Sequence, residues 1–226
     1  MVTGIIVGSG WVHSDLLRNL SKQSIQTPYG NVEYWVKDSA VIIQRHGNPV
    51  MPPHKINHHA NIKALQQLGA EKIVALNSTG SLKAALKPGM LIIPHDFMTF
   101  LAPPTFYDTG FHFTTPKISE EVRSYIARLL KQVQLTAKNG VYIQTHGPRY
   151  ETKAEIKAMT KMADIVGMTL ASEATLACEC NIPYASLCTV DNYAHGIGAK
   201  PLGQSVLEQA QQKNMMVLEK VLRLIQ

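Results

Sequence analysis

The sequence is poor in cysteine and has no long apolar run. Its three cysteines, Cys178, Cys180 and Cys188, are an odd number and lie close together. Such a set does not form a disulfide framework, and one C-x-C pair alone is a poor zinc motif. No apolar run reaches the roughly 18 residues that cross a bilayer, and the first residues do not resemble a signal peptide. These absences predict a cytoplasmic location and no membrane partner.

Blocks of one charge are also lacking, although the chain is basic. Its 22 Lys and Arg residues against 16 Asp and Glu give a formal net charge of +6. The basic residues are scattered rather than gathered in a run, so nucleic acid is not an expected partner. A small anionic substrate accounts for the excess charge equally well.

The order of strand-like and helix-like segments predicts the fold. Apolar runs typical of strands lie at Gly4–Val7, Val41–Gln44, Ile73–Leu76, Leu91–Ile93, Val141–Gln144 and Ala185–Val190. Segments with helical spacing lie at Lys55–Leu68, Ser119–Gln132, Lys153–Met162, Ala171–Glu179 and Gly203–Leu224. This alternation, in a chain of 226 residues that can bury one sizeable core, favours a mixed, mainly parallel sheet flanked by helices. We expect a single α/β domain over residues 1–226.

Unusual polar segments follow the strand-like runs. They read "GSGW", "QRHGNPVMPP", "NSTGS", "THGPRYET", "VGMT" and "VDNYAHG". Ligands of open α/β sheets bind beyond the carboxyl ends of the strands, so these segments should carry the chemistry. "VGSGW" and "NSTGS" are predicted as loops rich in amides and hydroxyls, and each alone is explained at least as well by a plain turn. Together with Arg45 and His46 they favour a phosphate pocket.

Two further features are open to a simple structural interpretation. The segment Gln44–Ile62 holds four histidines, but His58 and His59 are adjacent and would lie on different helix faces. Without an H-E-x-x-H motif or a third ligand we expect no metal site, and His54, His58 and His59 are read as polar helix residues. Glu151 in "GPRYET" is either a residue that favours a helix N-terminus or a residue of the site, and the sequence leaves both open.

In order and spacing, several motifs resemble the trimeric purine nucleoside phosphorylase and methylthioadenosine phosphorylase family. They are "GIIVGSGW", "RHG", "PPHKINHHANIKAL", "GPRYETKAE", "DIVGMT" with "SEATLA", and "IPYASLCTVDN". The resemblance implies a homotrimer that cleaves purine nucleosides with inorganic phosphate as co-substrate and no other cofactor. The implied phosphate ligands are Ser9, Arg45, His46, the backbone of Asn77 and Ser78, and Thr169. Met168, Glu151, Asn192, Tyr193 and Ala194 would contact the nucleoside, and Asn192, Glu151 and His46 would take part in catalysis.

The base and sugar pockets point to one substrate. Ionised Glu151 only accepts hydrogen bonds and so matches the N1–H of a 6-oxopurine, while Asn192 can serve O6 and a protonated N7. If the adjacent Asp191 took the place of Asn192, adenine would be favoured. The family's 5′ site corresponds to a segment with Leu202, Val206 and Leu207 and no histidine. We therefore expect S-methyl-5′-thioinosine as substrate. The alternatives are an inosine and guanosine phosphorylase, a methylthioadenosine phosphorylase, a nucleoside hydrolase, or a non-catalytic binding protein for purines or nucleic acid.

Overall fold

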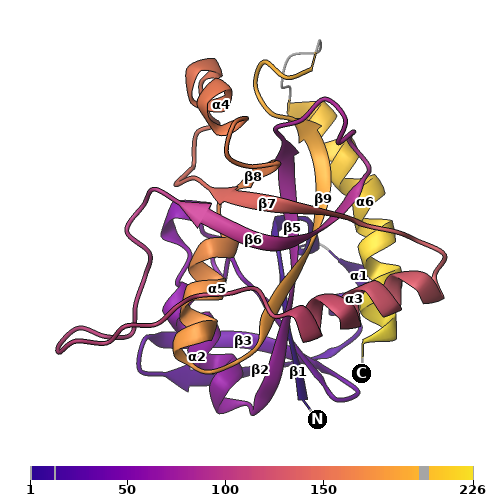
Figure 1. Cartoon of the computed structure of the whole chain (residues 1–226). Coiled ribbons are helices and arrows are strands. Elements are labelled where there is room, and N and C mark those ends of the chain that lie inside the picture. Colours follow the sequence, from indigo (N-terminus) through magenta and orange to yellow (C-terminus); the bar gives the residue numbers. More distant parts are fainter. Residues whose placement is uncertain (1, 13, 199–203, 226) are drawn as a thin grey trace.

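The sheet is mixed and partly closed on itself (Figure 1). A computed structural model describes residues 2–12, 14–198 and 204–225, with only the backbone of residues 204–211. The strands are β1 (Val2–Val7), β2 (Ser21–Thr27), β3 (Gly30–Lys37), β4 (Ala40–Gln44), β5 (Ala70–Ser81), β6 (Leu91–Thr99), β7 (Lys138–Gln144), β8 (Ile165–Gly167) and β9 (Tyr184–Tyr193). Their order is β2-β3-β4-β1-β5-β8-β7-β6-β9, and β9 also pairs with β5. The five strands from β5 to β9 thus close into a ring, from which β1 to β4 extend.

Pairing directions support the predicted α/β class. Strands pair in parallel in β1–β4, β1–β5, β5–β9, β6–β7 and β7–β8, and antiparallel in β2–β3, β3–β4, β5–β8 and β6–β9. The expected mixed, mainly parallel sheet is confirmed. Each of the six predicted strands is present, although β5 and β9 run further than their apolar cores.

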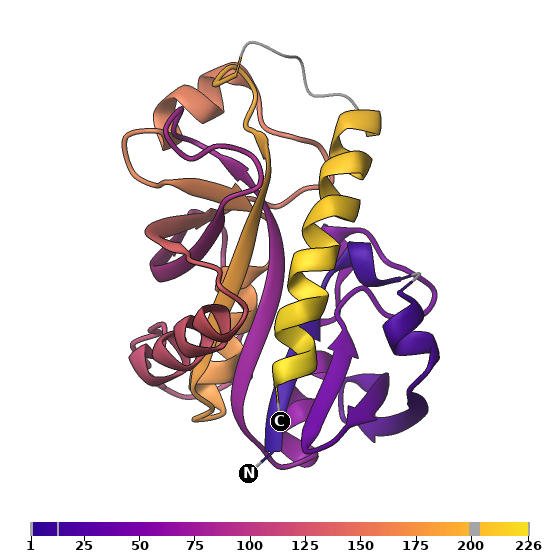
Figure 2. The same ribbon diagram turned by 90° about the vertical axis from the view of Figure 1, so that its right-hand side faces the viewer.

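Helices cover both sides of the sheet. They are α1 (Asp15–Arg18), α2 (His58–Gln67), α3 (Glu120–Gln132), α4 (Lys153–Met159), α5 (Leu170–Glu179) and α6 (Gln204–Leu224), with 3₁₀ turns η1 (Ser9–Trp11) and η2 (Pro53–Lys55). In Figure 1, α2 and α5 lie together on one side and α3 and α6 on the other. Figure 2 shows α6 running along the strands beside β9. Across the described ranges, no helix is both long and apolar enough to cross a membrane.

Capping residues decide where the predicted helices begin. Helix α2 starts at His58 and not at Lys55, because Asn57 is its N-cap and its side chain accepts a hydrogen bond from the Ala60 amide at 3.0 Å. Helix α4 starts after Thr152, which forms a capping box with Glu155. Since Glu155 serves the helix end, Glu151 is not needed there.

Two segments predicted as loops are strands. Residues 77–81, "NSTGS", complete β5, and the first residues of "VDNYAHG" complete β9, where Asn77 pairs with Cys188 and Ser78 with Thr189. The loop prediction was wrong because small and polar residues are poor strand formers in general, whereas here each strand has a neighbour to pair with. The polar side chains therefore come from a sheet and are held more rigidly than a loop would hold them.

Candidate active site

A cavity of about 180 Å³ lies at the carboxyl ends of four parallel strands. Strands β4, β1, β5 and β9 run in the same direction, so the residues that follow or end them meet at one edge. The segments Gly8–Trp11, Tyr150–Glu151 and Val166–Thr169 complete the walls, and α6 closes one side. The cavity thus forms where the sequence predicted the chemistry.

Most of the predicted site residues line this cavity. They are Ser9, Arg45, His46, Ser78, Glu151, Met168, Thr169, Asn192 and Ala194. Asn77 and Tyr193 are not among the lining residues. The side chain of Asn77 is buried behind the wall, where its Nδ2 donates to Thr169 Oγ1 at 2.8 Å. The hydroxyl of Tyr193 donates to the carbonyl of Ala84 at 3.1 Å and so faces another part of the protein. Successive side chains of a strand point to opposite faces, which separates Asn77 from Ser78.

Arg45 is buried and fixed by several acceptors. Its Nε donates to Glu173 Oε1 at 2.6 Å, and Nη1 and Nη2 each donate to the carbonyl of Leu76 at 3.1 Å. The guanidinium lies against Gly8, where an added Cβ would stand 2.6 Å from Nη1. A side chain at position 8 would therefore displace the arginine, which explains why the sequence has glycine there.

His46 is held in its neutral form. Its Nδ1 lies 2.7 Å from the carbonyl of Met51, which can only accept, so Nδ1 carries the proton and Nε2 is an acceptor. Burial, with a smaller effect from the charge of Arg45, lowers the pKa of His46 from its usual range. At neutral pH this residue can take a hydrogen bond or a proton from a ligand.

A β-bulge brings two neighbouring residues of β9 to the same cavity. The register with β5 shifts so that Thr79 pairs with Val190 and Gly80 with Asn192. Asp191 and Asn192 consequently both line the cavity, although consecutive strand residues normally face opposite ways.

The two side chains have different environments. Asp191 accepts hydrogen bonds from Ser78 Oγ, from Thr189 Oγ1 at 2.7 Å and from Asn214 Nδ2 at 2.7 Å. Burial raises the pKa of Asp191, and these three donors oppose the rise. Asn192 donates only to its neighbour's carbonyl, that of Tyr193, at 2.8 Å. Asn192 is the freer of the two to contact a ligand.

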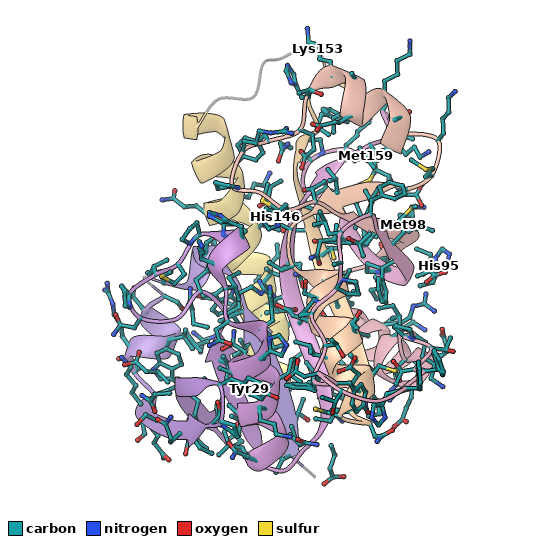
Figure 3. The ribbon with its side chains drawn as sticks, turned by 90° about the vertical axis from the view of Figure 1, so that its left-hand side faces the viewer. Tyr29, His95, Met98, His146, Lys153 and Met159 are labelled. Carbon is teal, nitrogen blue, oxygen red and sulfur yellow. The ribbon has the colours of Figure 1, made fainter. Side chains whose placement is uncertain are left out.

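Glu151 points into the site and not along the helix. It is 8% exposed, and its Oε1 accepts from Thr145 Oγ1 at 2.6 Å. Its loop is packed against η2, where the rings of His54 and His146 lie 5.8 Å apart. Figure 3 shows His146 between Tyr29 near one end of the molecule and Lys153 near the other. Because Thr145 Oγ1 donates to it, the Glu151 carboxylate is oriented before any ligand arrives.

Sequence reasoning missed the apolar part of the cavity wall. Trp11, Met215 and Leu218 line it, the last two from α6, and an added Cβ at Gly10 would stand 3.0 Å from Met215 Sδ. The helical spacing of α6 marks apolar positions but does not say which of them face a cavity and which face the core. Of the predicted 5′ residues, Leu202 and the side chains of Val206 and Leu207 lie outside the described residues.

The histidines of the segment Gln44–Ile62 have separate roles. His59 stacks on Tyr29 with ring centroids 5.2 Å apart, and burial lowers the pKa of His58 to about 3. In the part of the chain that the structure describes, no three His, Cys, Asp or Glu residues are grouped to hold a metal ion.

Comparison with known proteins identifies close relatives. Residues 2–226 match the family described as the phosphorylase superfamily. A protein of Archaeoglobus fulgidus named "Probable 6-oxopurine nucleoside phosphorylase" is 41% identical over 201 residues, which cover 86% of this chain and 83% of that protein. A protein of Methanocaldococcus jannaschii named "Probable S-methyl-5'-thioinosine phosphorylase" is 40% identical over 227 residues, 96% of this chain and 89% of its own. The solved methylthioadenosine phosphorylase of Schistosoma mansoni in complex with adenine has a TM-score of 0.87 at 25% identity, covering 98% of this chain and 89% of that one.

Proposed function

The chain belongs to the phosphorylase superfamily, and from this we propose that it is a purine nucleoside phosphorylase acting on 6-oxopurine nucleosides in purine salvage. It transfers the sugar from the base to inorganic phosphate and needs no metal or organic cofactor. The observation that carries the proposal is the single cavity that combines donors for an anion with Glu151 and Asn192. The three free cysteines fit a cytoplasmic enzyme.

Phosphate binds at the inner end of the cavity. Arg45, the hydroxyls of Ser9 and Thr169, the backbone of Ser78, and His46 surround this position. Neutral His46 accepts the hydroxyl hydrogen of hydrogen phosphate on Nε2, which leaves unprotonated phosphate oxygens to face the sugar. Pre-placed donors hold the nucleophile beside C1′, and this orientation supplies much of the rate enhancement.

The purine leaves as the phosphate arrives. A phosphate oxygen forms a bond to C1′ while the C1′–N9 bond breaks, the electron pair of the C1′–N9 bond passes to the purine, and the purine takes up a proton from solvent water at N7. The Asn192 carbonyl accepts this N7–H, and the second hydrogen of its Nδ2 reaches O6. Glu151 accepts the N1–H of the base. The proton at N7 neutralises the charge that builds on the purine, and the Asn192 Nδ2–H group stabilises charge at O6.

The sugar pocket favours a methylthio group at the 5′ position. Trp11, Met215 and Leu218 give it an apolar lining in which a methylthio group gains contact, whereas a hydroxyl would lose its partners in water. We therefore assign S-methyl-5′-thioinosine as the preferred nucleoside. The products are hypoxanthine and S-methyl-5-thioribose 1-phosphate.

The active form is a homotrimer. Phe111 and Phe113, on the segment between β6 and α3, are 91% and 92% exposed, and Phe100 is 70% exposed. Large apolar side chains grouped on one segment favour coverage by a second chain. Figure 1 shows this segment extending away from the rest of the fold.

The direct test is base release with and without phosphate. Methylthioinosine, inosine, guanosine, adenosine and methylthioadenosine are each incubated with the protein, and free base and sugar 1-phosphate are measured. Hypoxanthine release should require phosphate, yield the sugar 1-phosphate and continue in the presence of a chelator. Equal release in phosphate-free buffer would instead identify a nucleoside hydrolase, and a loss with chelator would contradict the metal-independent mechanism.

A further inference from the structure

A buried carboxylate lies outside the cavity and has no role in the steps described above. Glu173 is 1% exposed in the first turn of α5, a helix whose other buried residues are apolar or small. An ionised carboxylate in such a place is costly unless charged and hydrogen-bonded partners compensate it. The contacts of Glu173 should therefore reveal why it is there.

Each oxygen of Glu173 has its own buried partner. Oε1 accepts from Arg45 Nε at 2.6 Å, and Oε2 accepts from the hydroxyl of Tyr184 at 2.8 Å. Tyr184 is 1% exposed, and burial raises its pKa well above the usual value, so its hydroxyl keeps the proton that it donates. Tyr184, Glu173 and Arg45 form a chain of contacts from β9 through α5 to the cavity.

This chain fixes the orientation of the guanidinium. Arginine has five N–H groups in a rigid plane. One of those of Arg45 is directed to Glu173 and two to the carbonyl of Leu76, and Nη2 also donates to the carbonyl of Ile6 at 3.5 Å, so the guanidinium is held in a defined direction. Neither Glu173 nor Tyr184 is among the residues that line the cavity. They can therefore act on a ligand through the orientation of Arg45 or through the charge of Glu173.

We infer that Glu173, held by Tyr184, is the positioning residue for the arginine that binds phosphate. The inference rests on the proposed function. Because Glu173 offsets the positive charge of Arg45, phosphate is held by directed donors and not by an unbalanced cation. Glu173 thus weakens the electrostatic attraction between Arg45 and phosphate but fixes the direction of the Arg45 donors.

Replacing Glu173 distinguishes a role in charge balance from a role in positioning, because the two roles predict opposite changes in the KM for phosphate. Glu173→Gln removes a negative charge beside the site, so a role limited to charge balance predicts a lower KM for phosphate. Positioning predicts a KM for phosphate that rises about tenfold or more, since the arginine loses a charged acceptor. The KM for methylthioinosine, measured at saturating phosphate, should change by less than about threefold. Tyr184→Phe keeps the ion pair and should raise the KM for phosphate by a smaller factor.

The Arg45→Ala background tests whether Glu173 acts through the arginine. There, Glu173→Gln should cause no further rise in the KM for phosphate, because the group that it positions is gone. Ser172→Ala is the matched control, since Ser172 precedes Glu173 in α5 and accepts a buried hydrogen bond from Gln144 Nε2 at 2.7 Å. It should lower Tm without changing the KM for phosphate.

Several outcomes would overturn the inference. An unchanged or lower KM for phosphate in Glu173→Gln would do so, as would an equal rise with and without Arg45. If Glu173→Gln does not fold, an unchanged KM for phosphate in Tyr184→Phe is decisive instead. Failure of the proposed function is recognised separately, because the wild-type protein would then show no phosphate-dependent base release.

Discussion

Single residues at the cavity define what the site can bind, and Glu151 and Asn192 are the clearest case. Both side chains are close to the purine position in the proposed complex, and each has hydrogen-bonding atoms with no partner among the described residues. Glu151 presents an acceptor and Asn192 presents both a donor and an acceptor. In the proposed complex, these groups match the donors and acceptors on the edge of a 6-oxopurine.

Base selectivity can be changed at these positions. The wild type should cleave methylthioinosine at least about a hundredfold better than methylthioadenosine, because adenine N1 would face an acceptor. Asn192→Asp should shift the ratio of kcat/KM values toward adenine, and the double variant with Glu151→Ser should shift it further. Glu155→Gln is the control, because Glu155 lies in the same segment but pairs with Arg149 at the surface. Equal turnover of both nucleosides by the wild type would contradict this assignment.

His58 makes stability depend on pH. Burial, followed by the charges of Arg45 and two neighbouring histidines, lowers its pKa from 6.5 to about 3 in the folded protein. Below pH 6.5 the unfolded chain takes up a proton that the folded chain does not, so stability is lost as the pH falls from 6.5 toward 3.

His58→Gln should reduce this dependence. Between pH 7 and pH 5 the wild type should lose roughly 2 kcal/mol more stability than the variant, since glutamine does not titrate. Urea unfolding at the two pH values measures the difference. Parallel losses in both proteins would show that His58 is accessible to protons in the folded state.

At the scale of elements, helix α6 and strand β9 shape the substrate cavity. The bulge in β9 turns Asp191 and Asn192 to one side, and the donors around Asp191 hold that arrangement. Helix α6 supplies Met215 and Leu218 to the cavity and Asn214 to Asp191. In the proposed complex, α6 thus lines the sugar pocket and also supports Asp191, which lies beside the base.

The apolar side of α6 should determine the preference for a methylthio group. We expect kcat/KM for methylthioinosine to exceed that for inosine by roughly 10–200-fold, the range that small apolar groups give. Met215→Gln should reduce this ratio, because a polar group of similar length would meet the 5′ substituent. Met216→Gln is the matched control, since Met216 is the next residue and is 68% exposed. A wild-type preference for inosine would show that the pocket is not apolar where the substituent lies.

At the scale of the whole molecule, the proposed trimer depends on the segment between β6 and α3. A trimer of 24.9 kDa chains would have a mass of about 75 kDa by light scattering at micromolar concentration. The double variant Phe111→Ser with Phe113→Ser should shift the mass toward that of one chain, because the interface loses its apolar contacts. Met216→Ser, an exposed apolar residue elsewhere, should leave the mass unchanged. A wild-type mass of about 25 kDa would exclude the trimer.

The sequence by itself determined the α/β class, the order of its main elements and most of the residues that meet at the cavity. Periodicity, helix caps and the short motifs are local, so they can be read from neighbouring residues alone. Ser9, Arg45, His46 and Glu151 were assigned to the site through the resemblance of ordered motifs along the whole chain to a known family, since the local pattern alone left Glu151 open. The three-residue strand β8 was missed, because so short a segment has too few residues to show a period.

Only the tertiary structure decided which way individual side chains face and which groups meet across long separations in sequence. Strand alternation turns the side chain of Asn77 behind the cavity wall and leaves Ser78 at the cavity. The bulge that admits Asp191 beside Asn192 depends on the register between β5 and β9, which no local pattern specifies. Glu173 and Arg45 are 128 residues apart, and their pairing exists because α5 packs against β9, which carries Tyr184, while Arg45 follows the end of β4. Such contacts depend on the packing of the whole chain, so a reading of separate segments cannot provide them.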